Sequence, residues 1–448
     1  MKNLTLRNIA RATDGNYFGD ETLLDESVRG VDKDSREIKE GYLYIPFVGA
    51  RVDGHDFIDD VFDKGALATL SEKELDTEHP YILVKDSGQA LKDIAEFYRE
   101  QLDCQIIGIT GSVGKTSTKE IIASVLSEKF NVLKTEGNFN NEIGMPLTLL
   151  KIREEHEIAV IEMGISFFDE MRRLSKVSKP DVCVITNIGT CHLENLNDRD
   201  GVLKAKTEMF ENAKPNCFTV LNGDDDKLAT IEEVNGRKPV FYGLESDRNI
   251  TAINIEPDGM NGTSCTIKYE DFEFDTYIPI PGLHMIHNAL AATCIGVHFG
   301  MTLDEIDKGI RNLKAIGGRN NIFENNGITI IDDCYNANPM SMKASIDVLN
   351  NSDGRKVAIL GDMFELGPDE EKLHKEVGEF INTKNIDLVI CIGKLSKNIA
   401  DVVNNSEVKY FKTKDELNTD ELIKEGDTVL VKASNGMKFK EIVEKLSE

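Results

Sequence analysis

A glycine-rich segment near residue 110 constrains the fold of this chain more than any other feature. It occupies residues 108–117 and reads Gly-Ile-Thr-Gly-Ser-Val-Gly-Lys-Thr-Ser. An apolar run at residues 105–110 leads into it, and apolar residues at helical spacing follow it. A glycine-rich turn between a strand and a helix is the setting of a phosphate-binding loop, in which backbone N–H groups at the helix N-terminus bind phosphate oxygens. The segment therefore predicts an α/β domain that binds a nucleotide.

Residues of this loop have separate expected roles. Lys115 should reach the β- and γ-phosphates, and the Thr116 hydroxyl can hold Mg²⁺. Ile109 stands where the common pattern has its first glycine, so an ordinary strand–helix turn is the alternative interpretation. The Gly-Lys-Thr-Ser sequence in this setting favours the nucleotide. The predicted nucleotide-binding residues of the loop are Gly111, Ser112, Val113, Gly114, Lys115, Thr116 and Ser117.

Apolar runs and their spacing divide the chain into three units, residues 1–103, 104–314 and 315–448. The first unit has short strands and no phosphate loop. In the other two, strands alternate with helices, which predicts two parallel sheets, and residues 251–277 alternate as an added β layer. The expected fold class is therefore α/β with three domains. These are a small N-terminal domain, a central phosphate-loop domain with a parallel sheet, and a Rossmann-like C-terminal domain.

Polar side chains follow predicted strands in the second and third units. Glu162 ends one strand, and His192 follows the next one. Ligands of open α/β sheets bind outside the carboxyl ends of the strands, so both are candidate Mg²⁺ ligands, although each fits a structural role equally well. Asp333 and Asp362 follow strands of the third unit. Polar groups at the strand ends of both sheets are expected of a cleft between two domains.

The charge balance limits the ligand classes. The chain has 52 Lys and Arg against 79 Asp and Glu, a net charge of −27. This charge repels polyanions, which argues against nucleic acid and acidic membranes as partners but leaves room for a small anion at a local cationic site. The eight cysteines include no C-x-x-C pair, and no apolar run approaches the roughly 18–20 residues of a membrane span. We expect a cytoplasmic chain with free thiols and no membrane insertion.

Segments from all three units together resemble the Mur ligase family of ATP-dependent amide-bond ligases. The resemblance spans nearly the whole chain. It is greatest to members that join D-Ala-D-Ala to UDP-N-acetylmuramoyl-tripeptide, because Glu-Met-Gly at 162–164 replaces the Ser-Ser-His-like segment of members that add the third residue. The resembling segments are residues 34–36, 49–57, 108–117, 135–146, 162–164, 205–210, 318–319, 332–341 and 360–367.

The resemblance implies the reaction and its ligands. ATP would phosphorylate the carboxylate of the tripeptide to an acyl phosphate, and D-Ala-D-Ala would attack it to give the UDP-muramoyl-pentapeptide precursor of the cell wall. The N-terminal, central and C-terminal domains would bind the UDP-substrate, ATP with Mg²⁺, and D-Ala-D-Ala, respectively. Other Mur-type ligases that add a different amino acid, and a nucleotide-binding switch without ligase chemistry, are the rival interpretations.

The resemblance also implies residue roles. Lys206, which by itself looks like a helix-surface lysine beside Lys204, matches the lysine that the family carbamylates to a metal ligand. Asn288 would contact adenine, Arg319 a phosphate and Asp333 the ribose. The implied catalytic residues are Lys115, Glu162, His192 and Lys206, and the implied metal ligands are Thr116, Glu162, His192 and Lys206. The implied substrate-binding residues are Ser35, Arg36, Asp53, His55, Asn138, Asn141, Asn336 and Asp362.

The chain departs from the family pattern in three places. Met285 stands where a second asparagine near adenine is common, and Asn435 stands where an arginine closes a Lys-Gly-Ser-Arg segment. Residues 165–169 are bulkier than the glycine-containing version of that segment. The first of these departures lies in a segment expected near adenine, and the second lies in one expected near the carboxylate of the incoming dipeptide.

Overall fold

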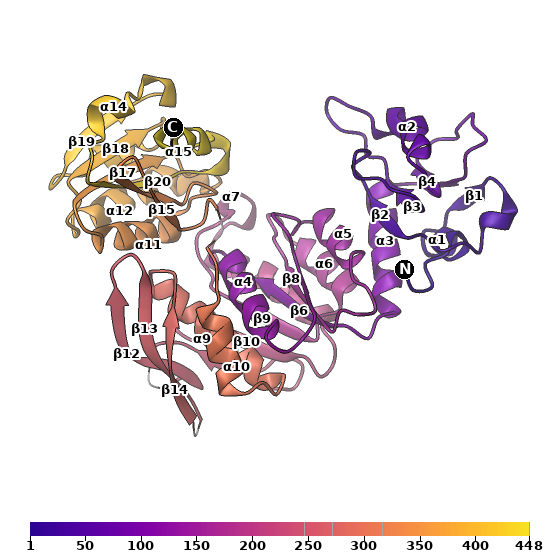
Figure 1. Ribbon diagram of the computed structural model, residues 1–448, viewed down its shortest axis with the longest axis horizontal. Helices are drawn as coiled ribbons and strands as arrows, with labels where there is room; N and C mark the ends of the chain where they lie inside the picture. Colours follow the sequence, from indigo (N-terminus) through magenta and orange to yellow (C-terminus); the bar gives the residue numbers. More distant parts are fainter. Residues whose placement is uncertain (246, 271, 316, 448) are drawn as a thin grey trace.

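The protein, seen here as a computed structural model, is described for residues 1–245, 247–270, 272–315 and 317–447. It contains a five-stranded, a nine-stranded and a six-stranded sheet, and these follow one another along the chain (Figure 1). Each sheet falls inside one of the three predicted units, which we call the N-terminal, central and C-terminal units. The expected α/β class with three domains is confirmed, and the residue boundaries between the units stay a prediction.

The N-terminal sheet has the order β1-β5-β4-β3-β2 and is parallel except for β1. Helix α3 runs from this sheet into the central unit, and its Arg99 donates to Asp181 at 3.0 Å. One apolar core extends from Leu4 to Leu228 across both units, so they form a continuous body. The elements are α1 (Leu6–Ala12), β1 (Asn16–Phe18), β2 (Gly30–Asp32), β3 (Tyr42–Tyr44), α2 (Ile58–Asp63), β4 (Ala68–Ser71), β5 (Tyr81–Leu83) and α3 (Ser87–Glu100).

The central sheet has the order β14-β13-β12-β11-β10-β9-β6-β8-β7. Strands β6 to β11 are parallel, and helices cover them. The strands are β6 (Gln105–Thr110), β7 (Val132–Lys134), β8 (Ile158–Glu162), β9 (Val182–Ile185), β10 (Phe218–Asn222), β11 (Val240–Tyr242), β12 (Ile250–Asp258), β13 (Gly262–Tyr269) and β14 (Phe272–Ile278). The helices are α4 (Lys115–Leu126), α5 (Gly144–Leu149), α6 (Glu170–Ser178), α7 (Leu193–Leu196), α8 (Arg199–Thr207), α9 (Leu283–His298) and α10 (Leu303–Arg311).

The expectation of an added β layer at residues 251–277 is wrong in one respect. Ile250 at the start of β12 pairs with Tyr242 of β11, so the strands extend the edge of the central sheet. Strands β13 and β14 then join antiparallel. The tip between β12 and β13 reaches the C-terminal unit, where Met260 packs against its core (Figure 1).

The C-terminal sheet has the order β15-β16-β20-β17-β18-β19 and is parallel except for β15. Asn338 caps helix α11 by accepting from the Ser341 N–H, and Pro339 occupies its first position. The elements are β15 (Asn321–Asn325), β16 (Ile328–Asp332), α11 (Pro339–Asn350), β17 (Arg355–Gly361), α12 (Glu370–Ile381), β18 (Leu388–Ile392), α13 (Lys397–Ala400), β19 (Glu407–Phe411), α14 (Thr419–Leu422), β20 (Asp427–Lys432) and α15 (Lys440–Leu446).

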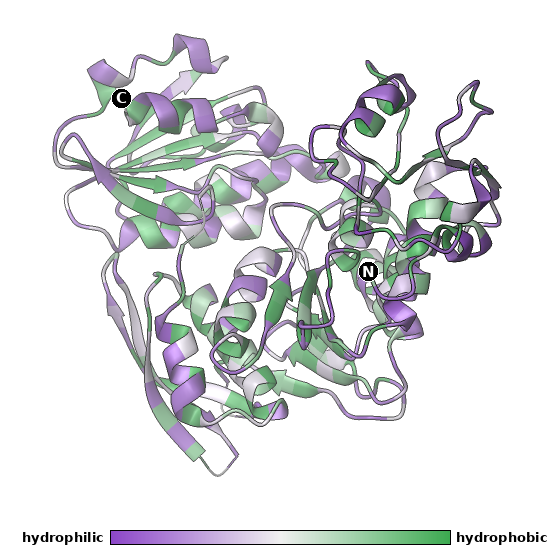
Figure 2. Cartoon of the chain, turned by 45° about the vertical axis from the view of Figure 1, so that its right-hand side comes forward, coloured by the Kyte–Doolittle hydropathy of each residue, from purple (hydrophilic) through white to green (hydrophobic). Residues whose placement is uncertain are grey.

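Apolar residues gather in the strands and on the helix faces that cover them, and polar residues face outward (Figure 2). All eight cysteines are free, and seven of them are buried. In the described ranges, no helix has the length and apolar character that crossing a membrane requires.

Candidate active site

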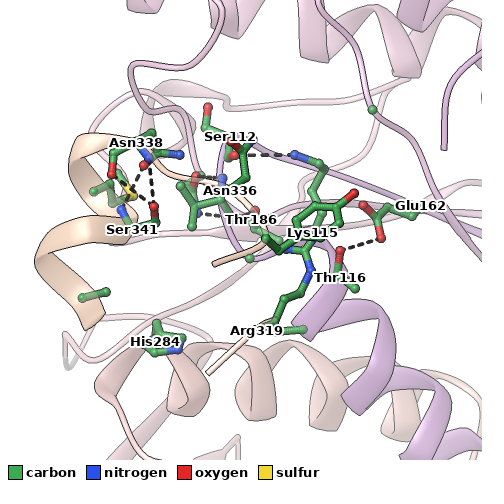
Figure 3. A pocket seen from close by; sticks show the side chains of 18 of the residues that line it. Ser112, Lys115, Thr116, Glu162, Thr186, His284, Arg319, Asn336, Asn338 and Ser341 are labelled. Carbon is green, nitrogen blue, oxygen red and sulfur yellow. Dashed lines mark hydrogen bonds between the residues drawn. The ribbon is translucent and has the colours of Figure 1, made fainter. Parts of the chain in front are cut away.

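A cavity of about 820 Å³ lies between the central and C-terminal units, at the carboxyl ends of the central strands (Figure 3). Thirteen of the predicted residues line it. They are Ser112, Val113, Gly114, Lys115, Thr116, Ser117, Asn141, Glu162, His192, Asn288, Arg319, Asp333 and Asn336. Residues that are distant in sequence therefore meet here, as the strand-end argument predicted.

The phosphate loop has the backbone conformation that its glycines allow. Gly111 and Gly114 have φ angles of +152° and +83°, and a Cβ atom on Gly111 would lie 1.9 Å from Thr186 Oγ1. Lys115 Nζ donates to the Gly111 carbonyl at 2.8 Å, and burial lowers the pKa of this lysine. In the described part of the chain, the N–H groups of residues 114–117 have no partner, so the start of α4 offers free donors to an anion.

Two other loop residues differ from the expectation. The N–H groups of Ser112 and Val113 donate to the backbone oxygen and the side chain of Asn187, at 3.0 and 2.9 Å. They are therefore not free to bind phosphate, although both residues line the cavity. The donors available for phosphate are the N–H groups of residues 114–117.

Glu162 is the central carboxylate of the cavity and is almost fully buried. Thr116 Oγ1 donates to its Oε2 at 2.9 Å, and Asn140 Nδ2 donates to its Oε1 at 2.8 Å. Lys119 Nζ, also buried, lies 3.9 Å from Oε2. Sequence reasoning chose Asn138 and Asn141 and missed Asn140, although all three belong to one motif. Asn138 is exposed and lies outside the cavity, and the short spacing of the three asparagines hid which one turns inward.

His192 faces the C-terminal unit. Its Nδ1 lies 2.6 Å from Glu365 Oε2 but is not aligned as a hydrogen bond, so the contact is an ion pair when the ring is protonated. The ring also lowers the pKa of Glu365. His192 has a left-handed backbone conformation with φ +55°, which is unusual for a residue with a side chain. The predicted metal ligand thus contacts a residue that sequence reasoning had not selected.

Lys206 and Lys204 differ sharply in environment. Lys206 is buried on α8, whereas Lys204 is exposed on the same helix. Burial, with the nearby charge of Lys115, lowers the pKa of Lys206 to about 7. Among the described residues nothing donates to or accepts from Lys206 Nζ, and Lys206 does not line the cavity. The structure thus distinguishes two lysines that looked alike in the sequence.

The predicted nucleotide residues outside the loop come from both sides of the cavity. Asn288 on α9 accepts from Thr118 Oγ1 at 2.8 Å, and its Nδ2 lies 3.4 Å from the sulfur of Met285. The departure at Met285 therefore packs directly against the residue expected to contact adenine. Arg319 from the C-terminal unit stacks on Tyr335, with 4.1 Å between the guanidinium carbon and the ring centroid.

Asp333 is held by two side chains of the C-terminal unit. Lys432 Nζ and Ser345 Oγ each donate to its Oδ2 at 2.5 Å. Sequence reasoning did not select Lys432, although it ends strand β20 at the same sheet edge and the strand-end rule would have found it. Asn336 lines the cavity on an exposed turn and accepts from Lys432 through its backbone oxygen at 3.2 Å.

Two histidines of α9 also line the cavity without having been predicted. His287 Nε2 lies 2.9 Å from Asp224 Oδ2, and Asp224 follows strand β10. Burial lowers the pKa of His284 to about 4, so this ring is neutral at pH 7. Asp224 follows a predicted strand as Glu162 does, so the same rule could have identified it.

The four predicted residues of the N-terminal unit lie away from this cavity. Arg36 is exposed and pairs with Asp34 at 2.6 Å, and the Ser35 carbonyl accepts from Lys64. Asp53 accepts from the backbone N–H of His55 and lies 2.6 Å from its buried ring, so these two residues fix one turn. The structure does not bring them to the nucleotide residues, and their role in binding substrate stays a prediction.

The environment of Asp362 differs from the one expected of a substrate-binding residue. This residue was expected to bind substrate, but it is buried and does not line the cavity. Its two oxygens accept from the backbone N–H groups of Lys394, Leu395 and Ser396, at 2.7 to 3.0 Å. These bonds occupy the carboxylate and join it to the turn that precedes α13. Asp362 therefore holds a loop in this structure.

Family models match all three units of the chain. The Mur ligase family catalytic domain matches residues 27–99, the Mur ligase middle domain matches 109–296, and the Mur ligase glutamate ligase domain matches 318–435. The UDP-N-acetylmuramoyl-tripeptide–D-alanyl-D-alanine ligase of Bacillus subtilis is 38% identical over 99% of this chain and 98% of its own length. The Escherichia coli ligase of the same name is 36% identical over 100% and 99%.

Solved structures agree with these matches. A crystal structure of MurF from Acinetobacter baumannii superimposes with a TM-score of 0.91 and 29% identity, covering 99% of this chain and 98% of that one. MurF ligase from Thermotoga maritima in complex with ADP gives a TM-score of 0.83 and 32% identity, with 94% and 97% covered. The resemblance noted in the sequence is confirmed: the chain belongs to the Mur ligase family.

Proposed function

We propose that this protein is an ATP-dependent ligase that joins D-Ala-D-Ala to UDP-N-acetylmuramoyl-tripeptide. The observation that carries the proposal is the full-length similarity to ligases of that name, at 38% and 36% identity. The cavity supports it, because a phosphate loop on one side faces a cation and a carboxylate, Arg319 and Asp333, on the other. A reaction that consumes ATP and a UDP-linked substrate belongs in the cytoplasm, where both are made.

The reaction has two steps. An oxygen of the tripeptide carboxylate attacks the γ-phosphorus of ATP, the bond from that phosphorus to the β-phosphate oxygen breaks, and ADP leaves. The amine of D-Ala-D-Ala then attacks the carbonyl carbon of the acyl phosphate. The tetrahedral intermediate collapses by losing phosphate, and the amine gives up a proton as the amide forms. Phosphate is a good leaving group, which a free carboxylate oxygen is not.

The phosphate loop would bind the polyphosphate of ATP. The free N–H groups at the start of α4 point to the cavity, and Lys115 is held beside them by the Gly111 carbonyl. On nucleotide binding, Lys115 would exchange this carbonyl for phosphate oxygens. Its charge would then offset the negative charge that develops on the transferring phosphoryl group.

The donors around Glu162 fit Mg²⁺. Glu162 and Thr116 offer a carboxylate and a hydroxyl, the hard oxygen donors that this ion prefers. In the described part of the chain, no three His, Cys, Asp or Glu side chains gather as a metal site. Mg²⁺, when bound with ATP, supplies positive charge next to the phosphates. His192 would join these donors only after leaving Glu365.

Lys206 would supply a second carboxylate if it is carbamylated. A neutral lysine amine adds CO₂ and loses a proton to give a carbamate, and the lowered pKa of about 7 makes the neutral amine available near pH 7. The buried position on α8 would protect the product from water. This environment supports the modification that the family resemblance implies and does not require it.

Residues of the C-terminal unit would complete the nucleotide site. The guanidinium carbon of Arg319 lies 4.1 Å from the centroid of the Tyr335 ring, and its N–H groups, which have no partner among the described residues, could reach a phosphate. Asp333 would accept from ribose hydroxyls, and Asn288 would contact adenine from the opposite wall. Because these residues come from two units, closure of the C-terminal unit would assemble the site and exclude water from the acyl phosphate.

The reacting ends of the two remaining substrates would enter this cavity, and the rest of each substrate would bind outside it. Ser35, Arg36, Asp53 and His55 would form part of the UDP-substrate site in the N-terminal unit, and Asn138 and Asn141 would face the peptide between the two sites. The C-terminal unit would hold D-Ala-D-Ala. There, Asp362 would hold the turn at residues 394–396 beside its own segment, in which Glu365 faces His192 of the central unit.

The proposal is tested by phosphate release. The protein is incubated with ATP, Mg²⁺, UDP-tripeptide and D-Ala-D-Ala, and each component is omitted in turn. The proposed ligase releases phosphate at full rate only in the complete mixture. Equal release without either the UDP-tripeptide or the dipeptide would indicate an ATPase and contradict the proposal.

A further inference from the structure

Residues 186–189, which follow strand β9, hydrogen-bond to the phosphate loop. Thr186 Oγ1 donates to the Val113 carbonyl at 2.6 Å, and the Ser112 N–H donates to the Asn187 carbonyl at 3.0 Å. The Gly189 N–H donates to Ser112 Oγ at 2.8 Å. The loop is therefore bonded to the neighbouring strand end as well as to its own helix.

The side chain of Asn187 makes the most specific of these contacts. Its Oδ1 accepts from the Val113 N–H at 2.9 Å, and its Nδ2 donates to the Val113 carbonyl at 2.9 Å. One rigid side-chain amide thus hydrogen-bonds to both the N–H and the carbonyl of a single loop residue. Because a planar amide fixes its donor and acceptor relative to each other, it sets the peptide planes on both sides of Val113.

These two hydrogen bonds influence how the backbone N–H donors of the phosphate loop are oriented. Val113 precedes Gly114, whose φ of +83° turns the chain into α4. Fixing the Val113 planes therefore fixes the direction of the free N–H groups at residues 114–117, which line the cavity. A loop already set in its binding conformation loses less entropy when phosphate binds.

We propose that Asn187 is a positioning residue that sets the phosphate loop for nucleotide before nucleotide arrives. The inference rests on the proposed binding of ATP and extends it to a residue that does not itself need to touch phosphate. Asn187→Ala removes both bonds to Val113 and leaves Lys115 and Thr116 in place. The expected result is about ten-fold weaker binding of ADP, since two hydrogen bonds that order the loop are lost.

A matched control exists in the C-terminal unit. Asn382 accepts from the Asn404 N–H at 2.9 Å and donates to the Val402 carbonyl at 2.9 Å. Like Asn187 it is partly buried, and it does not line the cavity. Asn382→Ala removes an equivalent pair of bonds, so it reports the loss of stability without a change in the phosphate loop.

The experiment is calorimetric titration of the full-length protein with ADP and Mg²⁺, together with KM values for ATP and for UDP-tripeptide. Asn187→Ala should raise the Kd for ADP and the KM for ATP, with the KM for UDP-tripeptide unchanged, whereas Asn382→Ala should change none of them. Thr186→Val removes one bond to the same carbonyl and should give a smaller rise in the Kd for ADP.

The outcomes separate this inference from the proposed function. Folded Asn187→Ala with a Kd for ADP within about two-fold of wild type would overturn the inference and leave the proposed function standing. If Asn187→Ala does not fold, an unchanged Kd for ADP in Thr186→Val would overturn it instead. A wild-type protein that binds no ADP would overturn the proposed function, and this inference with it.

Discussion

The hydroxyl of Thr116 donates a 2.9 Å hydrogen bond to Glu162, and this bond joins the phosphate loop to the end of strand β8. Strands β6 and β8 are neighbours in the central sheet, so the loop after β6 and the carboxylate at the end of β8 lie at one sheet edge. Two of the four predicted metal ligands, Thr116 and Glu162, therefore touch each other.

Replacing Glu162 tests this arrangement. Glu162→Gln keeps the shape and an acceptor for Thr116 but removes the charge. We expect the Mg²⁺ concentration for half-maximal phosphate release to rise at least about ten-fold, because a hard cation loses its carboxylate ligand. The control is Glu136→Gln, which removes an exposed carboxylate paired with Lys151 at 2.7 Å. An unchanged Mg²⁺ requirement would show that Glu162 is not a ligand.

Lys115→Ala should abolish phosphate release and leave the fold intact, because it removes the charge that faces the β- and γ-phosphates. Lys129→Ala is a comparison variant, since Lys129 also donates to a backbone carbonyl, that of Gly300 at 2.5 Å, but is exposed. Turnover measures the activity of both variants, and circular dichroism shows whether each one is folded. Near-normal turnover by folded Lys115→Ala would remove the phosphate-loop assignment.

The proposed carbamylation of Lys206 has a pH signature. Its pKa of about 7 means that the amine is mostly neutral above this pH and protonated below it. With ¹³C-bicarbonate, a carbamate signal in the ¹³C NMR spectrum should be strong at pH 8 and decrease toward pH 6. Lys206→Ala should lack the signal and be nearly inactive. Excess bicarbonate should not restore its activity. A short carboxylate, which can replace the missing metal ligand, should restore part of it. Lys204→Ala should keep both signal and activity, and a fully active Lys206→Ala would contradict the carbamate assignment.

The stacking of Arg319 on Tyr335 gives a further prediction. Tyr335→Phe keeps the ring face, whereas Tyr335→Leu removes it and frees the guanidinium to move. Since a cation–π contact contributes about 0.5–2 kcal/mol, the KM for ATP should rise roughly two- to thirty-fold in Tyr335→Leu and little in Tyr335→Phe. Equal KM values in the two variants would mean that the ring does not orient Arg319.

Much of the fold followed from the sequence because its strongest signals are local. The run at 105–110, the glycines after it and the apolar spacing of α4 predicted a strand, a loop and a helix at the observed places. The edge strands were harder. Strand β19, at residues 407–411, lies at the edge of its sheet and has few fully buried side chains, so its pattern is weak. The junction of β11 with β12 depends on a single backbone pairing that composition cannot reveal.

The candidate site was partly predictable for a related reason. The strand-end rule found Glu162 and His192, and applied consistently it would also have found Asp224 and Lys432. It could not distinguish a carboxylate that faces a cavity from one that holds a loop, as Asp362 does. Burial, which distinguishes Lys206 from Lys204, depends on the packing of α8 and became visible only in three dimensions.

The identity of the acceptor tests the central claim most directly. A dipeptide carries its carboxylate one residue away from the attacking amine, so binding at the remote end can fix the amine near the acyl phosphate without crowding it. The loop at residues 361–367 faces the central unit through Glu365 and is a candidate for shaping that site.

The measurement is mass spectrometry of the products formed with ATP and Mg²⁺ from each UDP-substrate and acceptor. UDP-tripeptide is offered D-Ala-D-Ala or D-Ala, and UDP-dipeptide is offered L-Lys or diaminopimelate. The account predicts UDP-pentapeptide from UDP-tripeptide and D-Ala-D-Ala, with far less product from single D-Ala. Preferential addition of L-Lys or diaminopimelate to UDP-dipeptide would contradict the account and assign the protein to a different reaction of the same family.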